Sequence, residues 1–156
     1  MLASVIGIDP TAVSSTPEFG VGQIGAVVSN NGVTKIYKYV EYKVGSGSVA
    51  AVSGNACYYN TLDGYKLNQV TSDLSDSVEI GAGILQSAPT DGQYCWIQIK
   101  GAATMAAALT AGADGDPLTA TGSSDGKLDV TADVTSVVVA YAGDISDKEI
   151  ICDFPF

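Results

Sequence analysis

The stretch Gly92-Gln-Tyr-Cys-Trp-Ile-Gln-Ile-Lys-Gly101 decides how the rest of the chain is interpreted. Between its two glycines the side chains alternate, and a period of two places successive residues on opposite faces of a β-strand. One face carries Cys95, Ile97 and Ile99, and the other carries Tyr94, Trp96, Gln98 and Lys100. We therefore predict a central strand with its first face on a core. Its second face, which bears the only tryptophan, is either covered or forms a contact surface.

Short runs of strand-forming residues recur on both sides of this stretch, separated by turn sequences such as Asn30-Asn31-Gly32 and Asp63-Gly64. The pattern predicts strands over 23–29, 33–44, 49–59, 66–71, 78–85, 118–121, 127–130, 134–141 and 148–154. The most hydrophobic of them, 134–141, is expected to be a buried strand. Many short strands with frequent turns predict an all-β fold, either a small β-barrel or a sandwich-like domain.

Three further segments do not follow the strand pattern. Residues 45–48, with the sequence Gly-Ser-Gly-Ser, predict a flexible tip or linker. Residues 71–77 are polar and predict a loop, with room for one helical turn capped by Ser72 or Asp73. The alanine-rich segment 102–113 favours a helix by propensity but strand pieces by its surroundings, so both remain open.

The first 22 residues predict an extended N-terminal arm. Prolines at positions 10 and 17, small hydroxyl residues and the absence of periodicity do not favour a packed element. We expect such an arm to be disordered or to be ordered by a neighbouring subunit, with Phe19 and Val21 as its anchors. Residues 23–156 are then a single β-rich domain, a size that can hold a real core.

Charge is sparse and unevenly distributed. Charged residues make up 15% of the chain, against roughly a quarter in an average protein, and the net charge is −10. Residues 1–60 are neutral overall, so the acidity belongs entirely to residues 61–156. An acidic chain without arginine is not expected to bind nucleic acid, and a weakly charged surface of small residues favours a component of an assembly.

The cysteines and the N-terminus both favour folding in a reducing cytoplasm. Cys57, Cys95 and Cys152 are odd in number and widely spaced, which favours buried free thiols over a disulfide with one thiol left over. No basic residue precedes Lys35, so a secretory leader is not expected, and no apolar run is long enough to span a membrane.

Catalytic chemistry has little support. The chain has no histidine, which removes Ser-His-Asp and Cys-His arrangements and the usual zinc sites. A carboxylate-only hydrolase remains as a minor alternative. Asp114, Asp116 and Asp125 could hold a calcium ion, but their Asp-Gly spacing is typical of tight turns, which is the preferred interpretation. We expect no enzyme activity and no cofactor.

Three motifs together resemble the capsid decoration, or cement, proteins of tailed bacteriophages. They are the strand 92–101, the turn Gly115-Asp-Pro-Leu118 and the hairpin Asp125-Gly-Lys-Leu128, and the terminal segment 148–154 also fits. The likeness covers roughly residues 78–156, and its motifs are structural rather than catalytic. It implies a small β-barrel-like subunit, usually trimeric, on the outer capsid surface, where it would clamp neighbouring major capsid proteins.

A structural virion protein is therefore the leading expectation. Its partners would be the major capsid protein and further copies of itself, with no membrane and no nucleic acid. The candidate protein-contact residues are Phe19, Val21, Tyr37, Tyr39 and Trp96. The rival interpretation is a β-sandwich binding module of the adhesin or carbohydrate-recognition type, in which an exposed Trp96 and tyrosines would stack on sugar.

Overall fold

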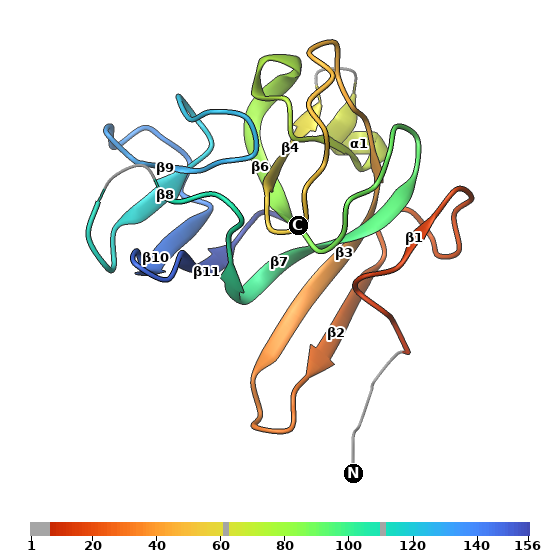
Figure 1. Ribbon diagram of the computed structural model, residues 1–156, viewed down its shortest axis with the longest axis horizontal. Helices are drawn as coiled ribbons and strands as arrows, with labels where there is room; N and C mark the ends of the chain where they lie inside the picture. The colour runs from red at the N-terminus through yellow and green to blue at the C-terminus, as the bar shows by residue number, and fades with distance from the viewer. Residues whose placement is uncertain (1–6, 61–62, 110–111) are drawn as a thin grey trace.

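Strand β7 (Tyr94–Thr104) lies at the centre of the fold and pairs with strands on both of its edges (Figure 1). The computed structural model describes residues 7–60, 63–109 and 112–156. One edge of β7 pairs with β3 (Thr34–Tyr42). The other edge pairs in turn with β1 (Val13–Ser14), β6 (Ser77–Leu85) and β11 (Glu149–Asp153). The predicted central strand is confirmed.

Five strands close into a barrel. β3 pairs in parallel with β5 (Gln69–Thr71), β5 pairs with β4 (Ala56–Asn60), and β4 pairs with β6. β6 then pairs with β7, and the β3–β7 pairing closes the ring. Closure removes the free edges of these strands. The predicted all-β fold with a small barrel is confirmed.

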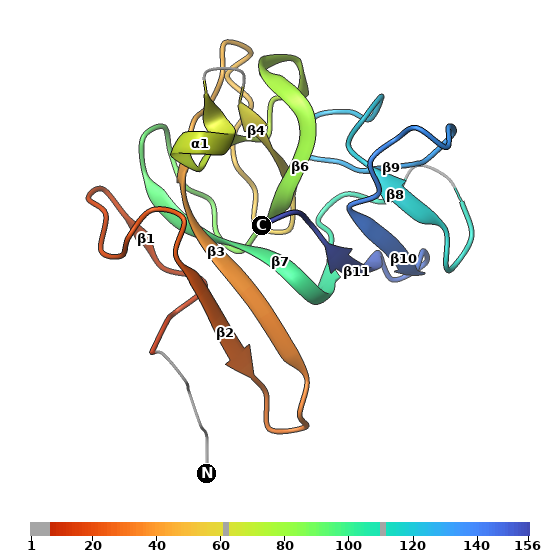
Figure 2. The same cartoon turned by 180° about the vertical axis from the view of Figure 1, so that it is seen from behind.

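The remaining strands extend this barrel in two directions (Figures 1 and 2). β2 (Ile24–Val28) forms a hairpin with β3 that projects away from the barrel. On the other side, β11 continues into β10 (Ala140–Asp144), β8 (Pro117–Thr119) and β9 (Asp129–Val130). The two helical elements of the described chain are the single turn α1 (Gly64–Leu67) and the 3₁₀ turn η1 (Leu74–Asp76), and no described helix is long enough to cross a membrane.

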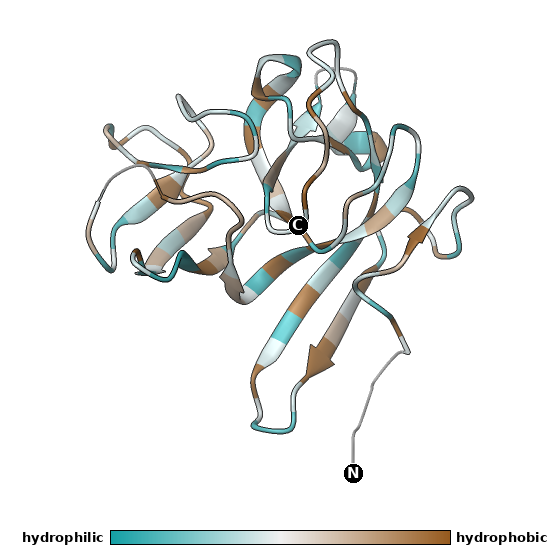
Figure 3. Ribbon diagram, in the orientation of Figure 1, coloured by the Kyte–Doolittle hydropathy of each residue, from teal (hydrophilic) through white to brown (hydrophobic). Residues whose placement is uncertain are grey.

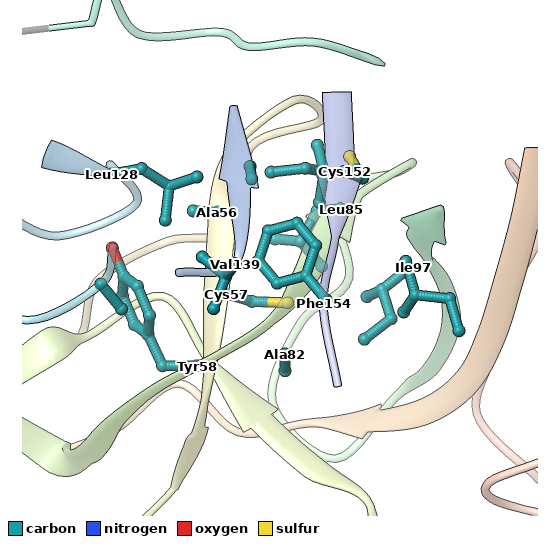
Figure 4. Close-up of a cluster of buried hydrophobic side chains, with 14 of the residues drawn as sticks. Ala56, Cys57, Tyr58, Ala82, Leu85, Ile97, Leu128, Val139, Cys152 and Phe154 are labelled. Carbon is teal, nitrogen blue, oxygen red and sulfur yellow. The ribbon is translucent and has the colours of Figure 1, made fainter. Parts of the chain in front are cut away.

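The main core fills the barrel and continues under β8, β10 and β11 (Figure 4). Ile97 and Ile99 of β7 are fully buried in it, as the alternation predicted, and Phe154 closes it from the chain's last segment. Glycine at position 83 allows close approach of β6 to β7, because a Cβ there would lie 2.9 Å from the carbonyl oxygen of Gln98. Gly81 in the same strand makes room for the ring of Phe154.

The polar loop 71–77 contains the predicted helical turn. The carboxylate of Asp73 caps η1 by accepting a hydrogen bond from the backbone N–H of Ser75. The same side chain accepts one from Gly47, and Asp76 accepts one from Ser46. The glycine-serine tip predicted to be flexible is therefore held by two carboxylates that lie about thirty residues further along the chain.

Several predicted segments differ from the structure. The run 134–141 is not a buried strand: β10 begins only at Ala140, and the side chains of Val134 and Val137 are exposed. The hydrophobicity of this run did not predict its burial. The strands that do pair, β10 and β11, alternate buried and exposed residues, and several residues of β10 are small. The strand predicted over 49–59 is limited to β4. The strand predicted over 66–71 begins only at Gln69, because α1 includes residues 66 and 67. In 102–113, where a helix and strand pieces were both left open, β7 continues as a strand to Thr104 and the described remainder is irregular, with 110–111 outside the described residues.

The three thiols are free and buried, as predicted. Burial raises the pKa of Cys95 and of Cys152 to about 12 and the pKa of Cys57 well above its ordinary value. Such thiols stay protonated near neutral pH and are poor nucleophiles. Their role in the described structure is packing.

Candidate protein-contact site

A second, smaller cluster of aromatic side chains lies on the outside of the barrel, and we call it the outer aromatic cluster. It is built on the faces of β3 and β7 that point away from the main core. Its members are Ile8, Phe19, Tyr37, Tyr39 and Trp96, with Val27 and Tyr94 at its margin. Because side chains alternate along a strand, β3 and β7 can supply both this cluster and the main core.

The rings of this cluster pack against one another, and two of the pairs are edge to face. The centroid of Phe19 lies 5.3 Å from that of Tyr39 and 5.2 Å from that of Trp96. The centroids of Tyr39 and Trp96 are 5.0 Å apart. Aromatic pairs at such distances contribute about 0.5–1.5 kcal/mol beyond the area they bury. The cluster is therefore a packed unit and not a set of separate exposed rings.

The described part of the N-terminal arm covers this cluster. Val13 pairs with Cys95 of β7, and the backbone N–H of Gly22 donates to the carbonyl of Tyr39 at 2.7 Å. Ile8 is buried against Gly25. The absence of a side chain at Gly25 makes room for Ile8, because a Cβ atom there would lie 2.7 Å from Ile8 Cδ1. Residues 7–22 are thus ordered on their own chain. The division of the chain into arm and domain at residue 22 stays a prediction.

Four of the five predicted contact residues come together in the outer aromatic cluster, and Val21 does not. Trp96 is 0% exposed, and its Nε1 has no hydrogen-bond partner in the described part of the chain. Tyr37 and Tyr39 are also buried, and Phe19 is half-buried above them. A partner could reach Trp96 only by displacing the arm. Val21 is exposed and lies at the start of the β2 hairpin.

Outside this cluster, the N-terminal part of the chain exposes apolar side chains and carries almost no charge, and we call these exposed residues together the N-terminal apolar surface. Figure 3 shows hydrophobic residues on both β1 and β2 in this part of the molecule. Its exposed members are Val13, Val21, Ile24, Val28 and Val33. Between positions 10 and 34 the only charged residue is Glu18. Sequence reasoning identified Val21 but missed the other four residues. For Ile24 and Val28, alternation along β2 was a usable signal.

Two grooves on the described part of the molecule contain lysine side chains. A groove of about 430 Å³ is lined by polar residues that include Lys43, Asp76 and Asp91. A second groove, of about 450 Å³, lies between the start of β2 and α1 and contains Lys38. Neither was predicted. For the second groove, the available sequence signal was Lys38. It shares a strand face with Ile36, Val40 and Tyr42, and this apolar surrounding indicates a buried lysine side chain.

The carboxylates considered for calcium each cap a turn. Asp114 accepts a hydrogen bond from the backbone N–H of Ile145, Asp116 from Ala113, and Asp125 from Leu74. Among the described residues, no group of three or more acidic or thiol side chains is arranged to hold a metal ion. These interactions account for the three aspartates as parts of the fold.

No family model, curated protein or solved structure matches this chain. The resemblance to phage decoration proteins therefore rests on the sequence motifs, and the function has to be argued from the surfaces described above.

Proposed function

We propose that this chain is a structural virion protein that binds the outer surface of a bacteriophage head and stabilises its major capsid shell. The observation that carries the proposal is the N-terminal apolar surface. Five exposed aliphatic side chains lie there in a stretch with one charge, although the chain as a whole has a net charge of −10.

The composition of this surface is that of a protein contact. Interface cores are depleted in charge, and contiguous apolar patches on a protein surface mark interaction sites. The β2 hairpin projects from the barrel, so Val28 and Val33 near its tip could enter a recess between neighbouring subunits (Figure 2). Val13 and Val21 extend the same apolar character along the arm.

The residues of the resembling motifs support a structural role. Leu118 and Leu128, which end the Gly-Asp-Pro-Leu and Asp-Gly-Lys-Leu motifs, are fully buried in the main core. Ile97 and Ile99 of the strand motif are buried with them. The residues of these motifs thus stabilise the core of the fold, as a structural role requires.

The proposal includes the expected partners. The chain would bind the major capsid protein and would associate as a homotrimer at three-fold positions of the capsid. The carbohydrate-recognition alternative relied on stacking by an exposed Trp96. Because that ring is fully buried, no specific observation favours this alternative.

Co-sedimentation with expanded phage heads tests the proposal. Val28→Asp places a charge on the N-terminal apolar surface and should weaken head binding at least tenfold, because an unpaired charge in an interface is costly. Val52→Asp is the matched control, since Val52 is an equally exposed valine outside that surface. Equal binding by the two variants and the wild-type chain would contradict the proposed surface.

Two further measurements test the assembly. Electron microscopy of heads with and without the protein should show added density at three-fold positions. Analytical ultracentrifugation of the purified chain should show a trimer in solution or on released capsid fragments. A strict monomer that adds no density to heads would overturn the proposed function.

A further inference from the structure

The groove between the start of β2 and α1 differs in charge from the rest of the molecule. Its walls come from residues 21–24, from Tyr65 and Lys66 of α1, from Asn68 and from Phe156. Two lysines line it and no acidic side chain does, although the chain has 17 acidic residues and 7 lysines. The side chains that line this groove therefore differ in charge from those of the chain as a whole.

Lys38 is the unusual member of this groove. Its side chain is only 5% exposed, on the face of β3 that points into the barrel. Its Nζ donates one hydrogen bond, to the hydroxyl of Tyr59 at 3.0 Å, and lies 5.3 Å and 5.8 Å from the ring centroids of Tyr59 and Tyr65. Among the described residues, no carboxylate forms an ion pair with it.

A buried ammonium with these partners is incompletely satisfied. It has three N–H donors, and burying a charge is costly unless it is paired and hydrogen-bonded. Cation–π contacts offset part of this cost. Burial lowers the pKa of Lys38, because no nearby anion compensates for the lost water. Lys66, the other lysine of the groove, already pairs with Asp63 at 3.2 Å, so Lys38 is the lysine without an anionic partner.

The walls of the groove are suited to an apolar group. Tyr65 is 56% exposed and Phe156 is 59% exposed, and the hydroxyl of Tyr65 donates to the main-chain oxygen of Phe156 at 2.9 Å. This hydrogen bond holds the two residues together at the rim. Val21 and Ile24 supply exposed aliphatic surface on the opposite wall.

We propose that this groove binds a carboxylate group attached to an apolar or aromatic body. The carboxylate accepts a hydrogen bond from Lys38 Nζ, and the apolar body packs on Tyr65 and Phe156. The carboxylate belongs either to a free small acid or to an acidic side chain of a partner protein. The site does not depend on the proposed capsid function, although Val21 and Ile24 belong both to this groove and to the N-terminal apolar surface.

Benzoate is the first probe, with benzamide as its neutral analogue. In NMR titrations of the wild-type chain, benzoate should cause saturable shifts of the backbone amides of Gly22, Tyr65 and Asn68, and benzamide should bind at least tenfold more weakly. Lys38→Met should weaken benzoate binding at least tenfold, and Lys38→Arg should retain it. Lys127→Met, a change at a lysine that does not line the groove, should leave it unchanged.

These measurements can overturn the proposal even if Lys38→Met does not fold, because benzoate and benzamide are compared on the wild-type chain. Equal binding of the two compounds would show an apolar recess with no role for the charge. No saturable shift with benzoate or with the peptide described next would show that the groove takes no carboxylate.

A short peptide distinguishes the two sources of the carboxylate. Acetyl-Val-Glu-Val-amide carries a single glutamate side chain, and its glutamine counterpart lacks the charge. Tighter binding of the glutamate peptide than of benzoate would identify a partner's acidic side chain as the ligand. Tighter binding of benzoate would identify a free small acid. Binding of the glutamate and glutamine peptides with equal affinity, together with equal benzoate and benzamide binding, would contradict both.

Discussion

The main core and the outer aromatic cluster are built on the same two strands, yet different parts of the chain complete them. The main core needs closure of the barrel, which brings together residues from Val40 to Phe154. The outer aromatic cluster needs only the outward faces of β3 and β7 and the arm, which supplies Ile8 and Phe19. This difference shows that the outward face of a central strand can be covered by the chain itself, and it is then not available to a partner protein. Here the arm covers it, through Ile8 and Phe19.

Replacement of Trp96 tests this comparison most strongly. Trp96→Ala should lower the free energy of unfolding by about 3–5 kcal/mol, because it empties a fully buried aromatic site. Ile97→Ala, on the opposite face of β7, should cost about 2–5 kcal/mol. Urea denaturation of both variants gives the values. If Trp96→Ala costs less than about 1 kcal/mol, the outer aromatic cluster is not a second core.

Alkaline pH should weaken the main core through its thiols. The folded state raises the pKa of Cys152 from 9.0 to about 12, so it holds the thiol proton more tightly than the unfolded state does. The stability from this group is complete below pH 9 and is lost as the pH rises toward 12. Between pH 9 and 10.5 the loss should be about 2 kcal/mol for one thiol.

The control for the thiol effect is Cys152→Ala, which lacks this titration. The difference in unfolding free energy between wild type and variant should shrink by about 2 kcal/mol between pH 9 and 10.5. Lys38 acts with the opposite sign, because its lowered pKa makes its burial less costly as the pH rises, but it is present in both proteins and cancels. Parallel pH profiles for the two proteins would contradict the assignment.

The contact between the arm and the outer aromatic cluster should be of intermediate size. Phe19→Ala removes two edge-to-face contacts from a half-buried position and should cost about 1–2 kcal/mol. It should also uncover Trp96 and shift the tryptophan fluorescence to longer wavelength. Val13→Ala, elsewhere on the arm, is the control and should leave the emission unchanged. An unchanged spectrum for Phe19→Ala would mean that the arm does not shield Trp96.

The hydrophobic run 134–141 should contribute least. Val137→Ser changes an exposed side chain and should alter the unfolding free energy by less than about 0.5 kcal/mol. Val139→Ala, only two residues away, empties a fully buried site and should cost about 2 kcal/mol. Equal costs at the two positions would restore the original expectation of a buried strand over the whole run.

The contact residues show how far sequence reasoning reaches. Phe19 was expected as an anchor of the arm, and alternation correctly separated the two faces of β7 and placed Trp96 on the surface opposite the core. It left open whether a partner or the chain itself covers that surface, because both choices bury the same aromatic residues. It also placed Lys38 among apolar neighbours on β3 without showing that a groove would open beside it.

The sequence by itself determined the all-β character, the central strand, the turns and the burial of the three cysteines. These features follow from local periodicity, turn chemistry and composition, which act over a few residues. The tertiary structure alone decided the parallel β3–β5 pairing, the closure of β3 on β7 and the path of the arm across Trp96. Those depend on contacts between residues far apart in the chain, whose choice of partner is set by packing and not by any local pattern. For the same reason, 134–141 looked like a buried strand by its composition, while its place in the fold leaves Val134 and Val137 in solvent.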